Sequence, residues 1–561
     1  MQLSEQEIVR REKLSKLREL GINPYPANLY PVNHTSKQVK ETFAEGKQVI
    51  IAGRLMSRRI QGSASFAEMQ DAEGRIQVYF NRDEICPGED KSHYNTVYKK
   101  LLDIGDFIGI EGELFTTKVG EKTVMVKNFT VLSKALRPLP LPKEKDGVVY
   151  DKFDDPEQRY RQRYADLVVN PQVKEVFVKR TKLFNAMRNF FNEAGYFEVE
   201  TPILQPIPGG AAARPFVTHH NSLNIPLYMR IANELYLKRL IVGGFDGVYE
   251  FSKNFRNEGM DRTHNPEFTA MEIYVAYKDY NWMMEFTESL LEHCAIAVNG
   301  TTTATFGEHS IDFKAPYKRV TMTQSIIDFT GFDITGKSEE ELREAAKGMG
   351  IDVDETMGKG KLIDEIFGEK CEGNYIEPTF ITDYPKEMSP LCKEHRENPE
   401  LTERFELMVC GKEIANAYSE LNDPIDQRER FEAQLKLSEK GDDEAMFIDN
   451  DFIRALEYGM PPTSGLGIGM DRLIMYLTNN PSIQEVLFFP QMKPERKQVA
   501  LTDEAKAVLE LLKKAEKLPL ADLKAQAGLS NKKWDKSIKE LTKNSLAKVE
   551  KNDDGLFVAI V

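Results

Sequence analysis

The segment that most constrains the fold lies at 248–277 and reads VYEFSKNFRNEGMDRTHNPEFTAMEIYVAY. Its pattern predicts a strand, a polar loop and a second strand, which together form an antiparallel hairpin. Alternation along the second strand gives one polar and aromatic face (Phe268, Glu272, Tyr274) and one apolar face (Met271, Ile273, Val275). The apolar face is therefore expected to lie on a core, and the polar face to line either a pocket or the protein surface.

The loop of this hairpin carries charged groups that can bind phosphate, namely Arg256, Arg262 and His264, beside Glu258. Arginine in particular holds phosphate oxygens through two parallel hydrogen bonds. The plain alternative is a hairpin with a charged tip in solvent, and alternation alone does not decide between the two.

A second candidate site lies at 405–423, FELMVCGKEIANAYSELND. Glu406 and Glu413 could share a hard cation such as Mg²⁺, which prefers carboxylate oxygens. Asn416, Tyr418 and Glu420 have the same strand parity and could line a pocket for a cationic group, although a half-exposed strand would show the same pattern. Simple alternation puts Glu413 opposite Glu420, and a β-bulge between them would bring both to one face.

A third candidate is SGLGIGMDRLIMYLT at 464–478, where small residues permit close backbone approach before a helix that begins near Asp471 and Arg472. Two nucleotide patterns are rejected. GFDITGKS at 331–338 matches a phosphate loop, but a short helix is expected before it, and Ser338 with Glu341 forms a capping box for the next helix. The glycines at 465–470 do not match the dinucleotide fingerprint.

The rest of the chain indicates an α+β protein of several domains. A helix at 4–20 precedes five short strands between 48 and 133, which suggest a small β-barrel, and a linker rich in proline follows at 137–148. A long amphipathic helix is expected from 173, ended by Gly195. We predict domains at 1–145, 146–500, with a helical insertion at about 300–400, and 501–561.

Composition narrows the class of protein. The net charge of −14 disfavours a generic basic nucleic-acid binder. Five scattered cysteines form no C-x-x-C pair, which is typical of a reducing compartment. No apolar run approaches 18 residues, and the first 20 residues lack the apolar core of a secretory signal. We therefore expect a cytoplasmic protein without a membrane span.

Taken together, these segments resemble the class II aminoacyl-tRNA synthetases, and within that class the lysine-specific family. The helix from 173 with GYFEVETPIL, the stretch FRNEGMDRTHNPEFTAMEIY and the stretch GLGIGMDRLIM look like the three motifs of the class. PGGAAARPF, IANELYLKRL and CGKEIANAYSELND look like the lysine-specific blocks. The resemblance covers about residues 1–500.

The resemblance implies an N-terminal oligonucleotide-binding (OB) barrel and a catalytic domain built on an antiparallel sheet. It implies a homodimer that activates L-lysine with ATP in the presence of Mg²⁺, and then transfers the lysine to tRNA(Lys). In that reaction Arg256 and Arg472 are the catalytic residues. The implied ATP-binding residues are Arg256, Glu258, His264, Asn265, Phe268, Glu413 and Arg472.

The implied lysine-binding residues are Gly210, Glu234, Arg256, Glu272, Tyr274, Asn416, Tyr418 and Glu420, and the implied metal ligands are Glu406 and Glu413. Arg59, Phe66 and Gln77 match anticodon-reading positions of the barrel, although Phe66 could instead be a barrel core residue. Three positions depart from the pattern of bacterial members: Asn233 replaces a proline, Thr263 replaces an arginine whose charge Arg262 could supply, and Ser63 replaces a lysine.

Two rival functions share these motifs. One is an enzyme that forms lysyl-adenylate and modifies a protein, but relatives of that kind look like the catalytic domain alone, without a barrel. The other is an RNA-binding or scaffold protein derived from a synthetase, which would not need to keep Arg256, Glu406, Glu413 and Arg472.

Residues 501–561 lie outside the resemblance to the core. Their pattern predicts three helices and a β-hairpin turning at 553–555, an order that looks like a small winged-helix module. Residues 531–551 hold seven lysines against three acidic residues. This basic helix either attracts tRNA phosphates or is a solvated face of a packing domain.

Overall fold

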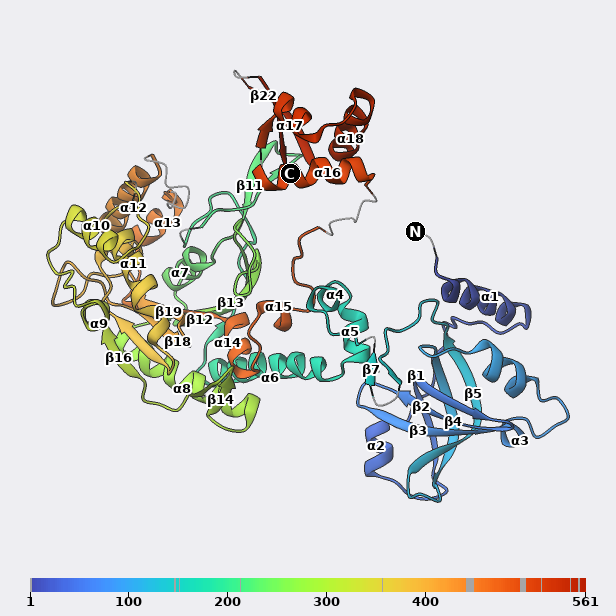
Figure 1. Ribbon diagram of the computed structural model, residues 1–561. Coiled ribbons are helices and arrows are strands. Elements are labelled where there is room, and N and C mark those ends of the chain that lie inside the picture. The colour runs from blue at the N-terminus through green and yellow to red at the C-terminus, as the bar shows by residue number, and fades with distance from the viewer. Residues whose placement is uncertain are drawn as a thin grey trace. The chain divides into compact units, whose positions relative to one another are not determined.

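The computed structural model describes residues 3–145, 148–150, 152–211, 213–355, 357–439, 448–494, 501–515, 517–544, 546–552 and 555–560 (Figure 1). The chain divides into two compact units, Met1–Gln491 and Met492–Val561. Among the described residues no helix is both long and apolar enough to cross a membrane.

The N-terminal part is a closed barrel of five strands, which confirms the prediction for 48–133. Its strands β1 (Gln48–Gln61), β2 (Ala64–Gln70), β3 (Arg75–Asn81), β4 (Phe107–Thr116) and β5 (Lys122–Ser133) are joined in the order β1-β2-β3-β5-β4. Every second residue points inward, and Val78, Ile110 and Val126 are fully buried there. Around the barrel lie α1 (Glu5–Glu19), α2 (Ser36–Glu41), α3 (Arg82–Ile85) and the π-helix η1 (His93–Leu101).

A connecting segment leads from the barrel to the central sheet. It contains β6 (Lys143–Lys145), β7 (Val148–Tyr150), α4 (Pro156–Arg161), α5 (Arg163–Val169) and α6 (Gln172–Glu193). The expected long helix is α6, and its buried face includes Phe177, Met187 and Phe191. Gly195 follows with a φ of +81°, a left-handed conformation that suits glycine and turns the chain toward β8 (Phe197–Glu198).

An eight-stranded, mostly antiparallel sheet forms the centre of the larger unit, in the order β16-β17-β18-β19-β20-β13-β12-β8. Its central strands are β12 (Gly247–Phe255), β13 (Glu267–Ala276), β18 (Arg404–Val409), β19 (Lys412–Ser419) and β20 (Thr463–Gly469). Residues of α6, α8 (Tyr280–Asn299) and α14 (Met470–Leu477) cover one face and form the largest core with it. This leaves the other face of the central strands for the site described below.

Several smaller elements surround the sheet. The strands β9 (Leu204–Gln205), β10 (Val217–His220) and β11 (Ile225–Met229) form a separate ribbon. The helices α7 (Glu234–Val242), α12 (Pro424–Glu439) and α13 (Asn450–Glu457) lie beyond the open face, and the short helix α15 (Ile483–Val486) follows α14.

The stretch at about 300–400 is less purely helical than expected. It contains α9 (Met322–Thr330), α10 (Glu339–Gly348) and α11 (Lys359–Lys370), with the hairpin β14 (Thr303–Phe306) and β15 (His309–Asp312). Its strands β16 (Lys318–Thr321) and β17 (Thr379–Thr382) extend the central sheet. Strands of four residues are too short to be recognised from the alternation of apolar and polar residues in the sequence. The expected capping box of Ser338 and Glu341 is confirmed, so 331–338 is a helix start and not a phosphate loop.

The C-terminal unit has its own core. It contains α16 (Asp503–Ala515), β21 (Lys517–Pro519), α17 (Leu520–Ala527), α18 (Asn531–Lys543), β22 (Ala547–Asn552) and β23 (Gly555–Ile560), with sheet order β21-β23-β22. Val508, Leu512, Trp534, Leu541 and Val558 are buried at its centre. The three helices and the final hairpin were expected, and β21 is an addition. Residues 553 and 554 of the expected turn lie outside the described residues, and assignment to the winged-helix fold stays a prediction.

Candidate active site

A cavity of about 710 Å³ opens on the sheet face that the helices leave uncovered. Nearly all sequence-predicted ligands of ATP, lysine and metal line this one cavity: Gly210, Glu234, Arg256, Glu258, His264, Asn265, Phe268, Glu272, Tyr274, Glu406, Glu413, Asn416, Tyr418 and Arg472. Glu420 is the exception, because it is buried and does not line the cavity. The structure thus brings residues more than 200 positions apart into one site.

The hairpin of β12 and β13 has the two faces that the sequence predicts. Met271, Ile273 and Val275 belong to the core on the helix side, whereas Glu272 and Tyr274 line the cavity. The loop begins where Arg256 N donates to Pro266 O at 2.9 Å. The Arg256 guanidinium lies 5.2 Å from the centre of the Phe268 ring, and its buried Nε has no hydrogen-bond partner among the described residues. This cation is therefore poised to receive an anion.

A β-bulge at Ile414 brings Glu413 to the same face of β19 as Asn416 and Tyr418. In the pairing of β18 with β19, Leu407 is opposite Ala415 and the next residue, Met408, is opposite Glu413, so that Ile414 is an extra residue. Ile414 and Ala415 are both buried, and Glu413 lines the cavity together with Asn416 and Tyr418. The bulge that would bring Glu413 and Glu420 to one face is therefore present.

The carboxylates of Glu406 and Glu413 both line the cavity and repel each other. Burial and then the charge of Glu413 raise the pKa of Glu406 to about 7, against the effect of the Arg404 guanidinium, which donates to Glu406 Oε1 at 2.6 Å. The described residues contain no group of three or more carboxylate, histidine or cysteine side chains that could hold a metal ion. Two carboxylates with no third protein ligand suit Mg²⁺, which typically keeps waters and binds substrate phosphates.

The floor of the cavity is a buried cluster of opposite charges. Lys238, fully buried on α7, donates to Glu234 Oε1 at 2.5 Å and forms an ion pair with Glu420. Tyr418 donates its hydroxyl to the same Glu234 oxygen at 2.7 Å. Burial raises the pKa of Glu420 well above its ordinary value, although the Lys238 ammonium opposes this shift. The floor thus holds more acidic than basic groups, an arrangement that favours an added cation.

Glu272 adds a third carboxylate to this floor. It accepts from the Tyr274 hydroxyl at 3.1 Å, and burial followed by the charge of Glu234 raises its pKa to about 8. Without a ligand this carboxyl group is therefore mostly protonated at neutral pH. An ammonium ion bound nearby would reverse the shift, because it stabilises the ionised form.

Two glycines make the floor possible. A Cβ atom at Gly465 of β20 would lie 2.2 Å from Glu420 Oε1 and 2.4 Å from a Tyr274 ring carbon, so any side chain there would displace both residues. Gly210 has a φ of +88°, and a Cβ atom there would approach Glu234 Cβ to 3.3 Å. Glycine at these positions lets backbone and floor side chains meet closely.

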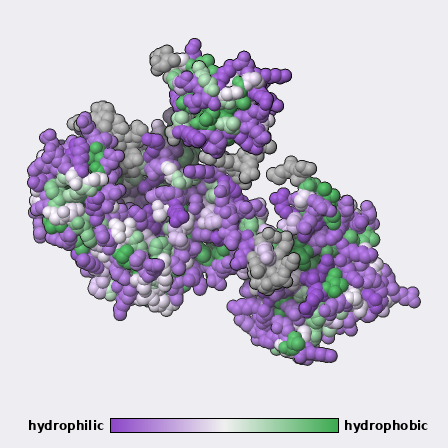
Figure 2. Space-filling model, viewed as in Figure 1, coloured by the Kyte–Doolittle hydropathy of each residue, from purple (hydrophilic) through white to green (hydrophobic). Residues whose placement is uncertain are grey.

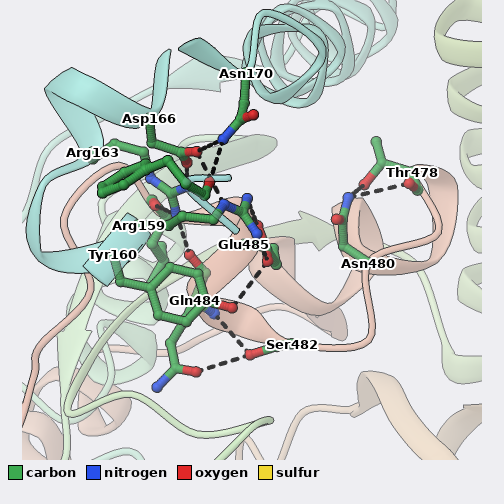
Figure 3. A network of polar contacts seen from close by, with 12 residues as sticks. Arg159, Tyr160, Arg163, Asp166, Asn170, Thr478, Asn480, Ser482, Gln484 and Glu485 are labelled. Carbon is green, nitrogen blue, oxygen red and sulfur yellow. Dashed lines mark hydrogen bonds and ion pairs between the residues drawn. The ribbon is translucent and has the colours of Figure 1, made fainter. Parts of the chain in front are cut away.

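A polar network links α4 and α5 to α15, whose residue Ile483 lines the cavity (Figure 3). Arg159 of α4 points its guanidinium at Glu485 of α15, with hydrogen bonds of 3.0 and 2.9 Å to the two carboxylate oxygens, and it also bonds Asp166 at 3.0 Å. On the other side of α15, Ile483 N donates to Arg262 O at 2.7 Å. The loop of the β12–β13 hairpin is therefore tied through α15 to the segment next to the barrel.

The three residues predicted to read an anticodon lie on the barrel and not in the cavity. Arg59 of β1 is paired with Phe66 of β2, and Gln77 of β3 accepts from the Thr123 hydroxyl at 2.8 Å. Phe66 is half-buried and its ring centre lies 4.8 Å from that of Tyr79, outside the barrel core formed by Ala67 and Met69. The alternative that Phe66 is a core residue is therefore wrong, because strand alternation turns it to the outer face.

Comparison with known proteins agrees with this geometry. Residues 155–493 match the family model of class II tRNA synthetases (D, K and N), and residues 49–132 match the model of an OB-fold nucleic acid binding domain. A lysine–tRNA ligase of Christiangramia forsetii is 80% identical over 560 residues, which cover 100% of this chain and 98% of that protein. The chain belongs to the class II lysine–tRNA ligase family.

Two further relatives of the synthetase are also lysine–tRNA ligases. The protein of Porphyromonas gingivalis is 72% identical over 501 residues, covering 88% of this chain and 87% of its own length. That of Azobacteroides pseudotrichonymphae is 64% identical over 497 residues, covering 88% of this chain and 99% of its own length.

Sequence reasoning missed two cations of the synthetase's cavity region. Lys238 follows Glu234 by four residues on a helix, a spacing that brings side chains together and could have revealed the pair. Arg404 precedes Glu406 by two residues on β18 and therefore lies on the same strand face. Its guanidinium also donates to Asn416 Oδ1 at 3.2 Å, which fixes two cavity residues at once.

Local contacts accompany two of the three departures from the bacterial pattern. Asn233, in the proline position, is buried and donates to Glu250 Oε2 at 2.9 Å. Thr263 bonds Asp261 at 3.0 Å, and His264 lies 2.9 Å from the same carboxylate. Arg262 is exposed and is not among the residues that line the cavity, so the structure gives no support for its replacing the missing arginine charge.

Proposed function

We propose that this chain catalyses the two-step attachment of lysine to tRNA(Lys). In the first step a carboxylate oxygen of L-lysine attacks the α-phosphorus of ATP, lysyl-adenylate forms and pyrophosphate leaves. In the second step the 3′-terminal ribose hydroxyl of the tRNA attacks the activated carbonyl carbon and AMP leaves. The observation that carries the proposal is one cavity with an acidic, buried floor and a cationic wall, which suits an ammonium substrate beside a nucleotide.

The cationic wall is proposed to bind the nucleotide. Arg256, whose buried Nε has no hydrogen-bond partner among the described residues, holds the α-phosphate and the lysine carboxylate, while Phe268 and Arg472 enclose the adenine from its two sides. Glu258, His264 and Asn265 of the hairpin loop contact the rest of the nucleotide. Negative charge builds at phosphorus in the transition state, so fixed cations lower the barrier without a protein nucleophile.

The floor is proposed to bind lysine. Glu234 and the Gly210 backbone receive the α-amino group, and Glu272, Tyr274 and Glu420 receive the side-chain ammonium, with Asn416 and Tyr418 along its length. The support is the burial of all three carboxylates, because a buried carboxylate that lacks a full complement of cations gains most from an incoming ammonium. A substrate with a neutral or acidic side chain would find no oppositely charged partner in this floor.

Glu406 and Glu413 are proposed to hold Mg²⁺ together with the phosphates of ATP. A bound Mg²⁺ would supply positive charge beside the pyrophosphate that leaves. The electrostatics of Glu406 support this assignment, because burial and then the charge of Glu413 raise its pKa, and a divalent cation would oppose both effects.

The active form is proposed to be a homodimer. Strand β8 is the last of the central sheet, and Phe197 on it is 57% exposed beside the exposed ring of Phe245, at 5.6 Å between ring centres. An unpaired strand edge next to exposed aromatic rings is a surface that proteins normally cover. Sedimentation of the wild type and of Phe197→Asp tests this, and the variant is expected to be monomeric.

Lysine-dependent exchange of pyrophosphate into ATP, followed by charging of tRNA(Lys), tests the function. We expect exchange with lysine and not with aspartate or asparagine, and charging that requires tRNA(Lys). Exchange without charging of any tRNA would point to an enzyme that modifies another acceptor. No exchange with any amino acid would overturn the proposal.

A further inference from the structure

The helix α18 of the C-terminal unit carries four lysines on one stripe. Lys532, Lys536, Lys539 and Lys543, called the lysine stripe below, are separated by four, three and four residues. At 100° per residue they fall within about 60° of the helix circumference, and they extend over about 16 Å along its axis. All four are exposed.

The opposite side of α18 anchors the helix in its unit. Trp534, Ser537 and Leu541 are buried, and the two apolar side chains belong to a core that includes Val508 of α16 and Val558 of β23. The mean direction of these three residues lies about 160° from that of the stripe. Packing therefore fixes the rotation of α18, and the lysine stripe must face away from the core. Figure 1 shows α16, α17 and α18 gathered in this unit, and Figure 2 shows its mainly hydrophilic surface.

The charges of the unit are segregated. Lys506, Lys513, Lys517, Lys533 and Lys548 each form an ion pair with an acidic residue. Glu540 of α18 is occupied with the N-terminus of α16, where it accepts from Thr502 N at 3.1 Å. None of the stripe lysines forms an ion pair within the part of the unit that the structure describes. Lys514, Lys524 and Lys551 likewise form no ion pair among the described residues of the unit, and α18 also carries the exposed Asp535. What distinguishes the stripe is that four such lysines share one helix face, in a chain whose net charge is −14.

We propose that the lysine stripe binds the phosphate backbone of tRNA. This proposal rests on the proposed function, which makes tRNA the polyanion that this chain meets. The stripe contains no arginine and no aromatic side chain, so it has neither the fork for bidentate base recognition nor a stacking platform. Lysine ammonium groups instead act as point charges toward phosphates, and such binding is independent of sequence and sensitive to salt.

The unit is an addition to the catalytic machinery. The synthetase family match ends at residue 493, before α16 begins. The Azobacteroides relative is matched over 99% of its own length but covers only 88% of this chain, so about 12% of this chain has no counterpart there. The stripe is therefore expected to change the affinity for tRNA and to leave lysine activation unchanged.

Two full-length variants with equal loss of charge test the proposal. In the first, all four stripe lysines are changed to glutamine. In the control, Lys506, Lys513, Lys517 and Lys548 of the same unit, which are ion-paired and half-exposed or more, are changed to glutamine. Binding of tRNA(Lys) is measured from 50 to 300 mM salt, with pyrophosphate exchange and thermal unfolding measured on both proteins.

The expected result is weaker tRNA binding by the stripe variant, about tenfold or more at low salt, converging with the wild type at high salt. Its slope of log affinity against log salt should be smaller by up to about 3, because each lost phosphate contact removes about 0.7 to 0.9. An equal loss in the control variant would show that only net charge matters and would overturn the proposal, as would unchanged affinity in both.

Binding to lipid vesicles and pyrophosphate exchange by the wild type are two further readouts. If the stripe variant binds tRNA normally but loses affinity for vesicles that contain anionic lipid, the stripe serves a membrane surface and the proposal is wrong. If the wild type shows no lysine-dependent exchange, the proposed function fails. The comparison of tRNA binding between the two variants still tests the role of the lysine stripe in that case.

Discussion

Lys238 and Glu420 form an ion pair in which both side chains are fully buried. Glu420 belongs to the proposed lysine-binding floor, and the Lys238 ammonium also bonds Glu234 at 2.5 Å. Lys238 therefore holds two floor carboxylates in place, and its charge opposes the rise that burial causes in the pKa of Glu420, while leaving the floor short of positive charge. We expect an incoming ammonium to supply that charge, so that the affinity for lysine would depend on a residue that does not line the cavity.

Changing Lys238 to methionine is expected to raise the KM for lysine at least tenfold. The pH at which this KM is lowest is expected to move to a higher value. Without the ammonium, which opposes the effect of burial on Glu420, Glu234 and Glu420 repel each other and the pKa of Glu420 rises further, and removal of one buried partner costs on the order of 2–5 kcal/mol. The KM for ATP should stay within about twofold. Arg239→Met is the control, because Arg239 is the next residue on α7 and pairs with Asp449 instead. An unchanged lysine KM at every pH would contradict this role.

Changing Glu420 to glutamine is expected to raise the lysine KM strongly in pyrophosphate exchange, with ATP binding nearly intact. The amide keeps the shape of the side chain but removes the charge that pairs with a cation. Glu403→Gln serves as the matched control, since Glu403 is also buried but bonds Arg396 and Ser419 away from the cavity. If both variants bind lysine like the wild type, Glu420 is not part of the lysine site.

The affinity for lysine is expected to increase as pH rises through about 8. In the free protein Glu272 has a pKa of about 8 and must lose a proton before it can pair with an ammonium. Lysine binding at pH 7 should therefore release about one proton, which calorimetry in buffers of different ionisation enthalpy measures. A flat affinity between pH 6.5 and 9, or no proton release, would place the ammonium elsewhere.

The same group predicts a pH dependence of stability. The folded pKa of Glu272 is raised above its ordinary value of 4.5, so the folded chain holds a proton that the unfolded chain releases. Its stabilisation is present in full below pH 4.5 and is lost as pH rises through about 8. Glu272→Gln mimics the protonated form, and its Tm should fall less than that of the wild type between pH 6 and 9.

Arg256→Ala is expected to abolish adenylation, whereas Phe66→Ala should leave pyrophosphate exchange intact and weaken tRNA charging. The two residues lie on separate structures, the cavity wall and the outer face of the barrel. Loss of one base stacked on an aromatic ring costs about 1–3 kcal/mol in tRNA binding. Phe66 would prove to be structural if its variant slowed tRNA-free exchange as much as charging.

Glu485→Gln is expected to lower Tm by several degrees and to raise the KM for ATP severalfold, with less effect on lysine. The substitution removes the paired hydrogen bonds from Arg159 and loosens α15, which supports the hairpin loop at Arg262. Buried hydrogen bonds between charged groups typically contribute about 1.5–3 kcal/mol. Glu157→Gln removes the more exposed ion pair with Arg161 and should change neither quantity.

Much of the site could be predicted from local patterns. Alternation in 267–276 separates the core face of Met271 from the cavity face of Glu272, because successive side chains on a strand must point to opposite sides. The capping box at Ser338 is equally local, since a hydroxyl and a carboxylate three residues apart satisfy the free N–H groups of a helix start. For the bulge, the sequence supplied only the condition that Glu413 and Glu420 share a face, and the pairing of β18 with β19 shows where it lies.

Only the tertiary structure decided the relationships between distant segments. The ion pair of Lys238 with Glu420 joins a helix to the end of a strand, and the space that Gly465 leaves for Glu420 and Tyr274 depends on how three chain segments cross. Strands β16 and β17 are likewise placed in the central sheet only by their pairing with neighbouring strands. Periodicity specifies which side of an element is buried, but which residues meet across that buried side depends on packing, and packing is a property of the whole fold.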